Sequence, residues 1–332
     1  MAAADEKRTG LLFGFGAYGL WGLLPLYWHF LDATGPGELL AQRMVWALPT
    51  AAVILAVLGK WTWVRPLLRQ PRRLALVAAA AAVISVNWFL YIYAVTHGMV
   101  IEGSLGYFIN PLVSIAFGVL LLNERLRALQ WTAVGVGALA VVVMTVAYGK
   151  LPWLSLALAL SFATYGLLKK RVGLGGVEGF SAESAMQFLP AAGFVVWLSV
   201  RGESTFVSEG AGHMVLLAFS GLATALPLIF FGGAAVRLPL STLGLLQYLA
   251  PVFMFALGLF AFHEEMPPER LAGFALVWLA LALLTWDALR TARRGRRELR
   301  RAAEQARAKG AVAAPADRHE HAGSSETEPT AG

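Results

Sequence analysis

The chain has 332 residues, of which 58% are hydrophobic and 14% are charged, and its net charge is +7. An ordinary soluble domain has about 45–50% apolar and about 25% charged residues, so this composition indicates a polytopic membrane protein instead. The absence of cysteine excludes disulfides and thiolate metal sites, and the basic residues of the last segment favour a membrane surface over nucleic acid as a partner.

The N-terminal stretch, residues 1–9, is basic and leads directly into an apolar run of spanning length, without a small-residue cleavage site after it. This pattern predicts a retained first helix rather than a signal peptide. Apolar runs near 20 residues, the length that crosses about 30 Å of hydrocarbon, then follow along the whole chain. We expect an all-α polytopic membrane protein with ten transmembrane helices, at about Leu11–Leu31, Leu39–Leu58, Leu74–Thr96, Gly103–Leu122, Ala128–Ala147, Trp153–Leu168, Phe180–Val200, Met214–Ala235, Leu240–Phe262 and Leu271–Leu289.

Two of these runs combine a proline with polar residues. Residues 102–111 read EGSLGYFINP and end on Pro111, and residues 241–251 read STLGLLQYLAP and end on Pro251. Proline lacks an amide hydrogen and crowds the carbonyl four residues earlier, so each proline is predicted to break its helix and free that carbonyl. The carbonyls concerned belong to Tyr107 and Gln247. In a bilayer such a group needs a partner, a water or a ligand.

The same residue types recur in both halves of the chain at one constant spacing. Pro111 and Glu124 are matched by Pro251 and Glu264 at the same offset. The chain is therefore predicted to contain two copies of one five-helix unit, residues 10–148 and 149–290.

The distribution of Lys and Arg predicts how these units cross the membrane. Outside the helices, only Lys150, Arg201 and Arg270 fall on one side, and all other Lys and Arg residues fall on the opposite side. By the positive-inside rule both termini are cytoplasmic. Five helices are an odd number, so the second unit enters the membrane inverted. Residues 291–332 are predicted to form a cytoplasmic tail that is first Arg-rich, next to anionic lipid headgroups, and then disordered.

Several motifs resemble the RarD branch of the EamA transporters, in the drug/metabolite transporter superfamily. The resemblance extends from Leu11 to Asp287 and implies ten helices in two inverted repeats and a secondary transporter of the bacterial inner membrane. His263 precedes Glu264 where EamA repeats often have glycine, which is one departure from the pattern. The matching residues are Asn87-Trp88, Glu102–Pro111, Asn123–Leu126, Ser161–Lys170 and Ala235–Gly244 with Gln247-Tyr248.

Polar and aromatic side chains near the two predicted breaks are the candidate substrate contacts. Asn110 lies about seven residues of ~1.5 Å each inside its helix, and Gln247 lies comparably deep from the other face. Inverted-repeat transporters bind substrate at such a midplane. The predicted contacts are Asn87, Trp88, Tyr107, Asn110, Gln247 and Tyr248. The alternatives are that Asn87 only joins helices and that the prolines only shape kinked helices.

Four further polar residues are candidates for coupling or gating. Arg43 lies about one turn inside the outer end of helix two, where snorkelling is the alternative to a function. Glu102 begins helix four, where a carboxylate also caps the helix, but a proton-driven exporter needs a group that protonates in one access state. Glu183 and Gln187 lie one turn apart in helix seven. Glu264 is expected to pair locally with Arg270.

The sequence shows no catalytic constellation, no metal-ligand spacing and no phosphate loop, so neither an enzyme nor a cofactor nor ATP-driven pumping is expected. The preferred interpretation is a secondary transporter that exports a small metabolite or drug-like solute, with proton coupling as one option. The alternatives are a passive channel or a non-transporting membrane receptor, with an intramembrane enzyme less favoured. The substrate and the oligomeric state stay open, a homodimer included.

Overall fold

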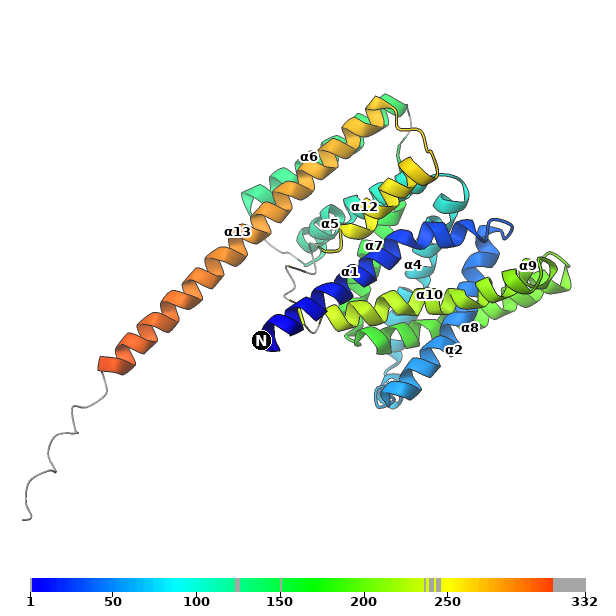
Figure 1. Ribbon diagram of the computed structural model, residues 1–332, viewed down its shortest axis with the longest axis horizontal. Coiled ribbons are helices and arrows are strands. Elements are labelled where there is room, and N and C mark those ends of the chain that lie inside the picture. Colours follow the sequence, from blue (N-terminus) through cyan, green and yellow to red (C-terminus); the bar gives the residue numbers. More distant parts are fainter. Residues whose placement is uncertain are drawn as a thin grey trace, which may run out of the picture. The chain divides into compact units, whose positions relative to one another are not determined.

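The computed structural model describes residues 2–122, 126–149, 151–235, 237–238, 242 and 246–312. Within these residues the chain is all helical, as predicted, and contains no strand (Figure 1). The long helices are α1 (Ala2–His29), α2 (Pro36–Leu58), α4 (Pro71–Thr96), α5 (Val100–Leu122), α6 (Ala128–Tyr148), α7 (Trp153–Val172), α8 (Gly176–Val200), α10 (Ala211–Ala235) and α13 (Pro268–Val312). The shorter ones are α3 (Val64–Leu68), α9 (Thr205–Ser208), α12 (Leu249–Ala256) and the π-helix η1 (Leu257–Ala261).

Eight of the described helices are long and apolar enough to cross a membrane, and two further helices, Trp153–Lys169 and Leu249–Ala261, are apolar but shorter. The chain is therefore a multi-pass membrane protein. Each predicted span overlaps one of these helical segments. The Arg-rich segment after Thr291 continues α13 as far as Val312, and the segment predicted to be disordered after it lies outside the described residues.

The ends of several helices follow directly from proline and glycine. Pro36 and Pro71 occupy the first positions of α2 and α4, where the missing amide hydrogen has no helical partner to lose. The residue after α2, Gly59, has φ 63°, a left-handed conformation that glycine adopts without steric cost. Local residue chemistry therefore determines where this helix begins and ends.

The two predicted helix breaks look different from each other. Helix α5 continues through Pro111 to Leu122 without interruption. Before α12, which begins at Leu249, residues Gln247 and Tyr248 form a turn after the helical residue Leu246, so the chain is interrupted at the predicted Gln247 and Pro251 lies in the first turn of the helix that follows. A first turn tolerates proline because its amides have no partner within the helix. Part of the stretch before α12 lies outside the described residues, as does Glu124.

The chain forms two compact units, Met1–Thr285 and Trp286–Gly332. Within the first unit, α1 packs beside α10, α2 beside α8, and α4 beside α7 (Figure 1). One buried cluster joins α5 and α6 to the first part of α13, around Leu105, Phe108 and Phe274. Another joins α1, α2, α4 and α10 around Trp28, Leu39, Tyr91 and Leu217, and this second cluster surrounds the candidate site.

Candidate functional site

The candidate site lies where α2 and α10 approach each other closely. A Cβ atom on Gly221 of α10 would collide with the backbone carbonyl of Trp46 on α2, so only glycine permits this contact. One turn further along α10, Thr224 is buried and faces α2. The close approach therefore brings a hydroxyl to the side chain of Arg43.

Arg43 is the charge at the centre of the site, and only 3% of its surface is exposed. Its Nε donates a hydrogen bond of 2.8 Å to Oγ1 of Thr224. The guanidinium carbon lies 3.9 Å from the ring centroid of Trp88 and 5.6 Å from that of Trp28. Both distances are within the range of a cation–π interaction, which strengthens when the cation is desolvated. Snorkelling does not describe this side chain, because its charged end is inside the protein.

No carboxylate of the described residues lies within ion-pair distance of Arg43. The acid nearest to it in α2, Glu38, accepts hydrogen bonds from the backbone amide and hydroxyl of Thr205 and from the hydroxyl of Ser204. The Nη1 atom of Arg43 has no hydrogen-bond partner among the described residues. A buried guanidinium thus keeps an unused donor and an unbalanced charge, a combination that is costly without a ligand.

Further buried donors without a partner among the described residues lie around Arg43. They are the indole nitrogen of Trp28 and the hydroxyl of Tyr91, both in the same buried cluster. The ring of Tyr91 packs edge-on against Tyr107, with centroids 6.0 Å apart. The phenol of Tyr27 donates to the carbonyl of Leu216. The arrangement is an aromatic enclosure with several unsatisfied hydrogen-bond donors and one cation.

Among the predicted substrate contacts, Trp88 and Tyr107 belong to this centre and Asn87 borders it. The amide nitrogen of Asn87 donates to the carbonyl of Leu158 at 3.0 Å and to Oγ of Ser161 at 2.9 Å. Its oxygen lies 3.5 Å from the hydroxyl of Tyr107. These contacts join α4 to α7, so the amide nitrogen of Asn87 is occupied as a helix-joining group in this conformation.

The other predicted contacts are not brought to Arg43 by any contact among the described residues. Asn110 is half-buried in α5 and lies 3.5 Å from Oγ of Ser114. Gln247 is exposed, and Tyr248 packs against the cluster of α5, α6 and α13.

Two of the gating candidates, Glu183 and Gln187, are held in place within α8. Glu183 pairs with Nζ of Lys169 at 3.0 Å and accepts a hydrogen bond from the hydroxyl of Tyr165 at 2.8 Å. The amide nitrogen of Gln187 donates to the carbonyl of Ala81 and to Oγ of Ser85. Glu183 therefore links α8 to α7, and Gln187 links α8 to α4.

A second glutamate, Glu264, caps the start of α5, where Glu102 also lies in the first turn. The carboxylate of Glu264, which lies in the connection between η1 and α13, accepts hydrogen bonds from the amides of Val100 and Ile101 at 2.5 and 2.9 Å. The charge of Arg270 also acts on Glu264, in the direction expected of the predicted local pairing. Burial raises the pKa of Glu264, the two amides and Arg270 lower it, and the neighbouring charge of Glu102 raises it. The net pKa is higher than that of a free carboxyl group.

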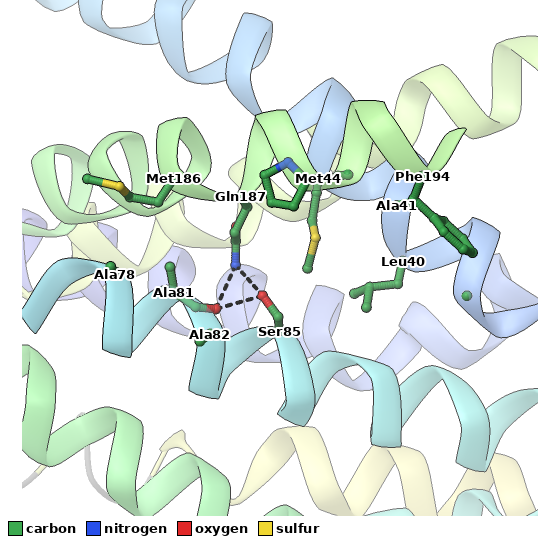
Figure 2. Close-up of a pocket in the computed structure, with 13 residues that line it drawn as sticks. Leu40, Ala41, Met44, Ala78, Ala81, Ala82, Ser85, Met186, Gln187 and Phe194 are labelled. Carbon is green, nitrogen blue, oxygen red and sulfur yellow. Dashed lines mark hydrogen bonds between the residues drawn. The ribbon is translucent and has the colours of Figure 1, made fainter. Parts of the chain in front are cut away.

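A separate cavity of about 500 Å³ lies between α2, α4 and α8. Figure 2 shows Gln187 reaching from α8 toward Ala81 and Ser85, and the lining is otherwise almost entirely apolar. Trp88 packs against Ala41 and Met44 of this lining and also stacks on Arg43. The amide oxygen of Gln187 in this lining has no hydrogen-bond partner among the described residues either. We place the recognition centre at Arg43 rather than in the cavity, because a buried charge with an unused donor selects a ligand more strongly than one neutral amide oxygen in an apolar wall.

The sequence singled out Arg43 and Trp88 but missed Thr224, Trp28 and Tyr91. No signal in the sequence marks the hydroxyl of Thr224, because one threonine in an apolar helix is common. Tryptophan and tyrosine near helix ends are equally common in membrane proteins as interface anchors. In the part of the chain that the structure describes, no group of histidines and carboxylates could hold a metal ion.

Comparison with known proteins decides the family. Residues 8–146 match the model of the EamA-like transporter family. A RarD protein of Streptomyces exfoliatus is 62% identical over 303 residues, which is 91% of this chain and 96% of that protein. The chain belongs to the EamA-like transporter family, in its RarD branch.

Two further comparisons bear on the family and on the fold. An uncharacterized transporter of Pseudomonas aeruginosa is 41% identical over 299 residues, covering 89% of this chain and 98% of its own length. A solved crystal structure covers 86% of this chain and 99% of its own with a TM-score of 0.55, at 20% sequence identity, which supports the fold alone. This RarD-type chain is thus a membrane transporter of the drug/metabolite family, and the relatives named above are bacterial.

Proposed function

We propose that this protein is a gradient-driven exporter of a small metabolite or drug-like solute, working by alternating access in the bacterial inner membrane. The proposal includes ten membrane-spanning helices in two inverted repeats, with both termini in the cytoplasm and the Arg-rich segment against anionic lipid headgroups. The observation that carries it is an internal symmetry in how the helices begin and pack.

Equivalent helices begin at one constant spacing in the two halves. Helix α8 begins at Gly176, 140 residues after α2 begins at Pro36. The same spacing of 140 residues separates the starts of α4 and α10, at Pro71 and Ala211. It also separates the starts of α6 and α13, at Ala128 and Pro268. This spacing equals the offset of the repeated prolines and glutamates, so helix boundaries support the repeat independently of the motifs.

The packing of the helices obeys the same relation. If α1, α2, α4 and α5 correspond to α7, α8, α10 and α12, then each contact in one half should recur in the other. The contact of α1 with α10 is matched by that of α7 with α4, and the contact of α5 with α7 is matched by that of α12 with α1. The pairs α2–α8 and α5–α12 map onto themselves. A two-fold arrangement of repeats that rock against each other is the architecture of many secondary transporters.

Contacts between loops support the proposed topology. The hydroxyl of Thr34 lies 2.6 Å from the hydroxyl of Thr205 and 2.6 Å from Nε2 of His213. These contacts bring the α1–α2 connection to the segment between α8 and the start of α10. Arg73 donates to the carbonyl of Val172, which brings the α2–α4 and α7–α8 connections together. The second group holds most of the basic residues of these loops, as expected of the cytoplasmic side.

The chain's lack of cysteine makes the topology directly testable. Single cysteines at Arg69, Arg237 and Arg297 should be protected from an impermeant reagent in intact cells, and cysteines at Glu203 and Glu265 should be labelled. A cysteine at Arg127, in the loop of the first unit that corresponds to the loop of Glu265, should also be protected. Labelling of Arg127 and Glu265 from the same side would contradict the inverted arrangement.

Purified protein in liposomes tests the transport mechanism. Uphill accumulation of a solute driven by an imposed gradient is the expected result, whereas downhill flux alone would support a passive channel, and ligand binding without flux a receptor. Within this assay Asn110→Leu and Gln247→Leu are expected to abolish transport while the protein stays folded and inserted. Full activity of both variants would remove these two residues from the solute pathway.

The role of Glu102 in proton coupling has its own test. Glu102→Gln should change the pH dependence of transport if this carboxyl group protonates in one access state. An unchanged pH profile would leave Glu102 with a structural role only.

A further inference from the structure

We propose that the transported solute is an organic anion with a flat apolar body, and that Arg43 binds its anionic group inside an aromatic enclosure. This inference rests on the proposed transport function and adds the chemical class of the solute and the residue that selects it.

The charge balance of the site argues for an anion. Arg43 is buried, its Nη1 atom has no hydrogen-bond partner among the described residues, and no described carboxylate pairs with it. A single neutral hydrogen bond to Thr224 and the face of Trp88 compensate only part of the desolvation of a guanidinium. A carboxylate or similar oxyanion supplies the missing charge and accepts from a planar fork of N–H donors.

The neighbouring donors argue in the same direction. The indole nitrogen of Trp28 and the hydroxyl of Tyr91 are also buried without a partner among the described residues. Together with Arg43 they offer three kinds of N–H or O–H donor and one positive charge, and the hydroxyl of Tyr91 is the one group of the three that can also accept. A site that is rich in donors and carries a positive charge selects a ligand with acceptors and disfavours an ammonium group, which would add a second buried positive charge.

The surfaces around these donors favour a flat apolar body. Trp28, Trp88 and Tyr91 present rings to the centre, and Tyr107 packs edge-on against Tyr91. Rings bind planar apolar groups by offset or edge-to-face contacts. Trp88 also contacts the residues that line the apolar cavity, so a body too large for the enclosure has apolar space on the other side of this ring.

Arg43 is almost fully enclosed in this conformation, so a solute must reach it through a movement of the helices. Alternating access provides such a movement, because separation of α2 from α10 or α1 would open the enclosure. The structure therefore corresponds to a conformation in which the recognition centre is closed.

The test uses three ligands with one body and different charges, namely 3-phenylpropionate, its neutral amide and 3-phenylpropylamine. The purified full-length protein in detergent is titrated with each, and the shift of its unfolding temperature gives an apparent Kd. The anion should bind about tenfold or more tightly than the amide, and the amine should not bind, because charge-assisted hydrogen bonds to the guanidinium are lost. Equal binding of anion and amide by the unmodified protein would overturn the inference.

Variants then assign the preference to a residue. Arg43→Gln should remove the preference for the anion, Arg43→Lys should keep part of it, and Arg201→Gln should leave it unchanged, because Arg201 is exposed and pairs with Glu203. If Arg43→Gln does not fold, the Arg43→Lys variant decides, since a point charge that lacks the planar fork should still weaken binding of the anion. An unchanged anion preference in the variants that fold would contradict the assignment.

Transport measurements separate this inference from the proposed function. Gradient-driven transport of solutes without any dependence on charge would leave the transporter proposal intact and refute the anion site. Binding of the anion that depends on Arg43, without transport of any solute, would confirm the site and refute the transporter proposal.

Discussion

Arg43 and Glu183 occupy equivalent positions in the two halves of the chain, since Glu183 follows Arg43 by the same 140 residues that separate the starts of their helices. Both side chains are buried within a membrane-spanning helix. Glu183 is neutralised by Lys169 and accepts a hydrogen bond from Tyr165, whereas Arg43 has neither a countercharge nor a partner for its Nη1 atom among the described residues. The proposed repeat relates these two positions, and the difference between them indicates that Arg43, rather than Glu183, is the charge that can bind a ligand.

The largest expected effect tests Arg43, the buried charge without a countercharge. Arg43→Gln should reduce transport in liposomes by about a hundredfold, because the charge and two or more charge-assisted hydrogen bonds to the solute are lost together. The unfolding temperature should fall little or even rise, since a buried charge without a countercharge is removed. Transport at the unmodified rate, with Arg201→Gln as the matched control, would show that Arg43 only stabilises the fold.

The second effect tests Glu183, the buried charge that is paired with Lys169. Glu183→Gln should destabilise the protein by about 2–3 kcal/mol, because Lys169 keeps its charge at a site that is only partly exposed. Thermal unfolding in detergent measures this change. The double variant Lys169→Met with Glu183→Leu should recover part of the loss, since neither charge then lacks its partner. If Glu183→Gln were as stable as the unmodified protein, the ion pair would not stabilise the fold.

A smaller effect is expected where the second half departs from the pattern of the EamA repeats. His263 has φ 51°, the left-handed conformation that glycine adopts without a clash, and it directs Glu264 back toward α5. His263→Gly should stabilise the protein by about 0.5–1 kcal/mol. Gly202→Ala is the matched control, because Gly202 has φ 70° and open space around it, and this change should destabilise by a similar amount. A destabilised His263→Gly variant would mean that the histidine ring contributes more than the strain costs.

The smallest effect is a dependence on pH at the cap of α5. Burial raises the pKa of Glu264 above its usual value, against the opposing influence of the amides of Ile101 and Val100 and of Arg270. The folded protein therefore binds this proton more tightly than the unfolded chain does. Its contribution to stability is present at low pH and is lost as the pH rises through the raised pKa.

As the pH rises from the usual pKa of a glutamate through the raised pKa of Glu264, the unfolding temperature of the unmodified protein should fall. It should fall by more than that of Glu264→Gln, in which the group no longer titrates. Glu102 also faces this carboxylate, so Glu102→Gln should bring the pKa of Glu264 closer to its usual value and narrow the range. Parallel pH curves of the unmodified protein and Glu264→Gln would show that Glu264 is not the titrating group.

The sequence alone determined the membrane class, the approximate positions of the spans and the repeated motifs, because these depend on local properties. The apolar run of α6 was expected at Ala128–Ala147 and the helix occupies Ala128–Tyr148. The interruption predicted near Gln247 is present as a turn, whereas the break predicted at Pro111 is absent because α5 continues to Leu122; a proline in an apolar run does not by itself reveal which helix is interrupted. The family followed from motifs along the chain, and comparison with relatives confirmed it.

The tertiary structure decided which polar residues are satisfied. Asn87, Glu183 and Gln187 look as exceptional in the sequence as Arg43 does, yet Glu183 is paired with the preceding helix, and the amide nitrogens of Asn87 and Gln187 donate to helices distant in the chain. Only the amide oxygen of Gln187 among these groups is without a partner in the described residues. Glu264 was expected to pair with a neighbour in sequence and also caps α5, which is distant in the chain. The physical reason is that burial and hydrogen bonding depend on the packing of several helices, which no local pattern encodes. Only that packing distinguishes a charge that holds the fold together from a charge that is left for a ligand.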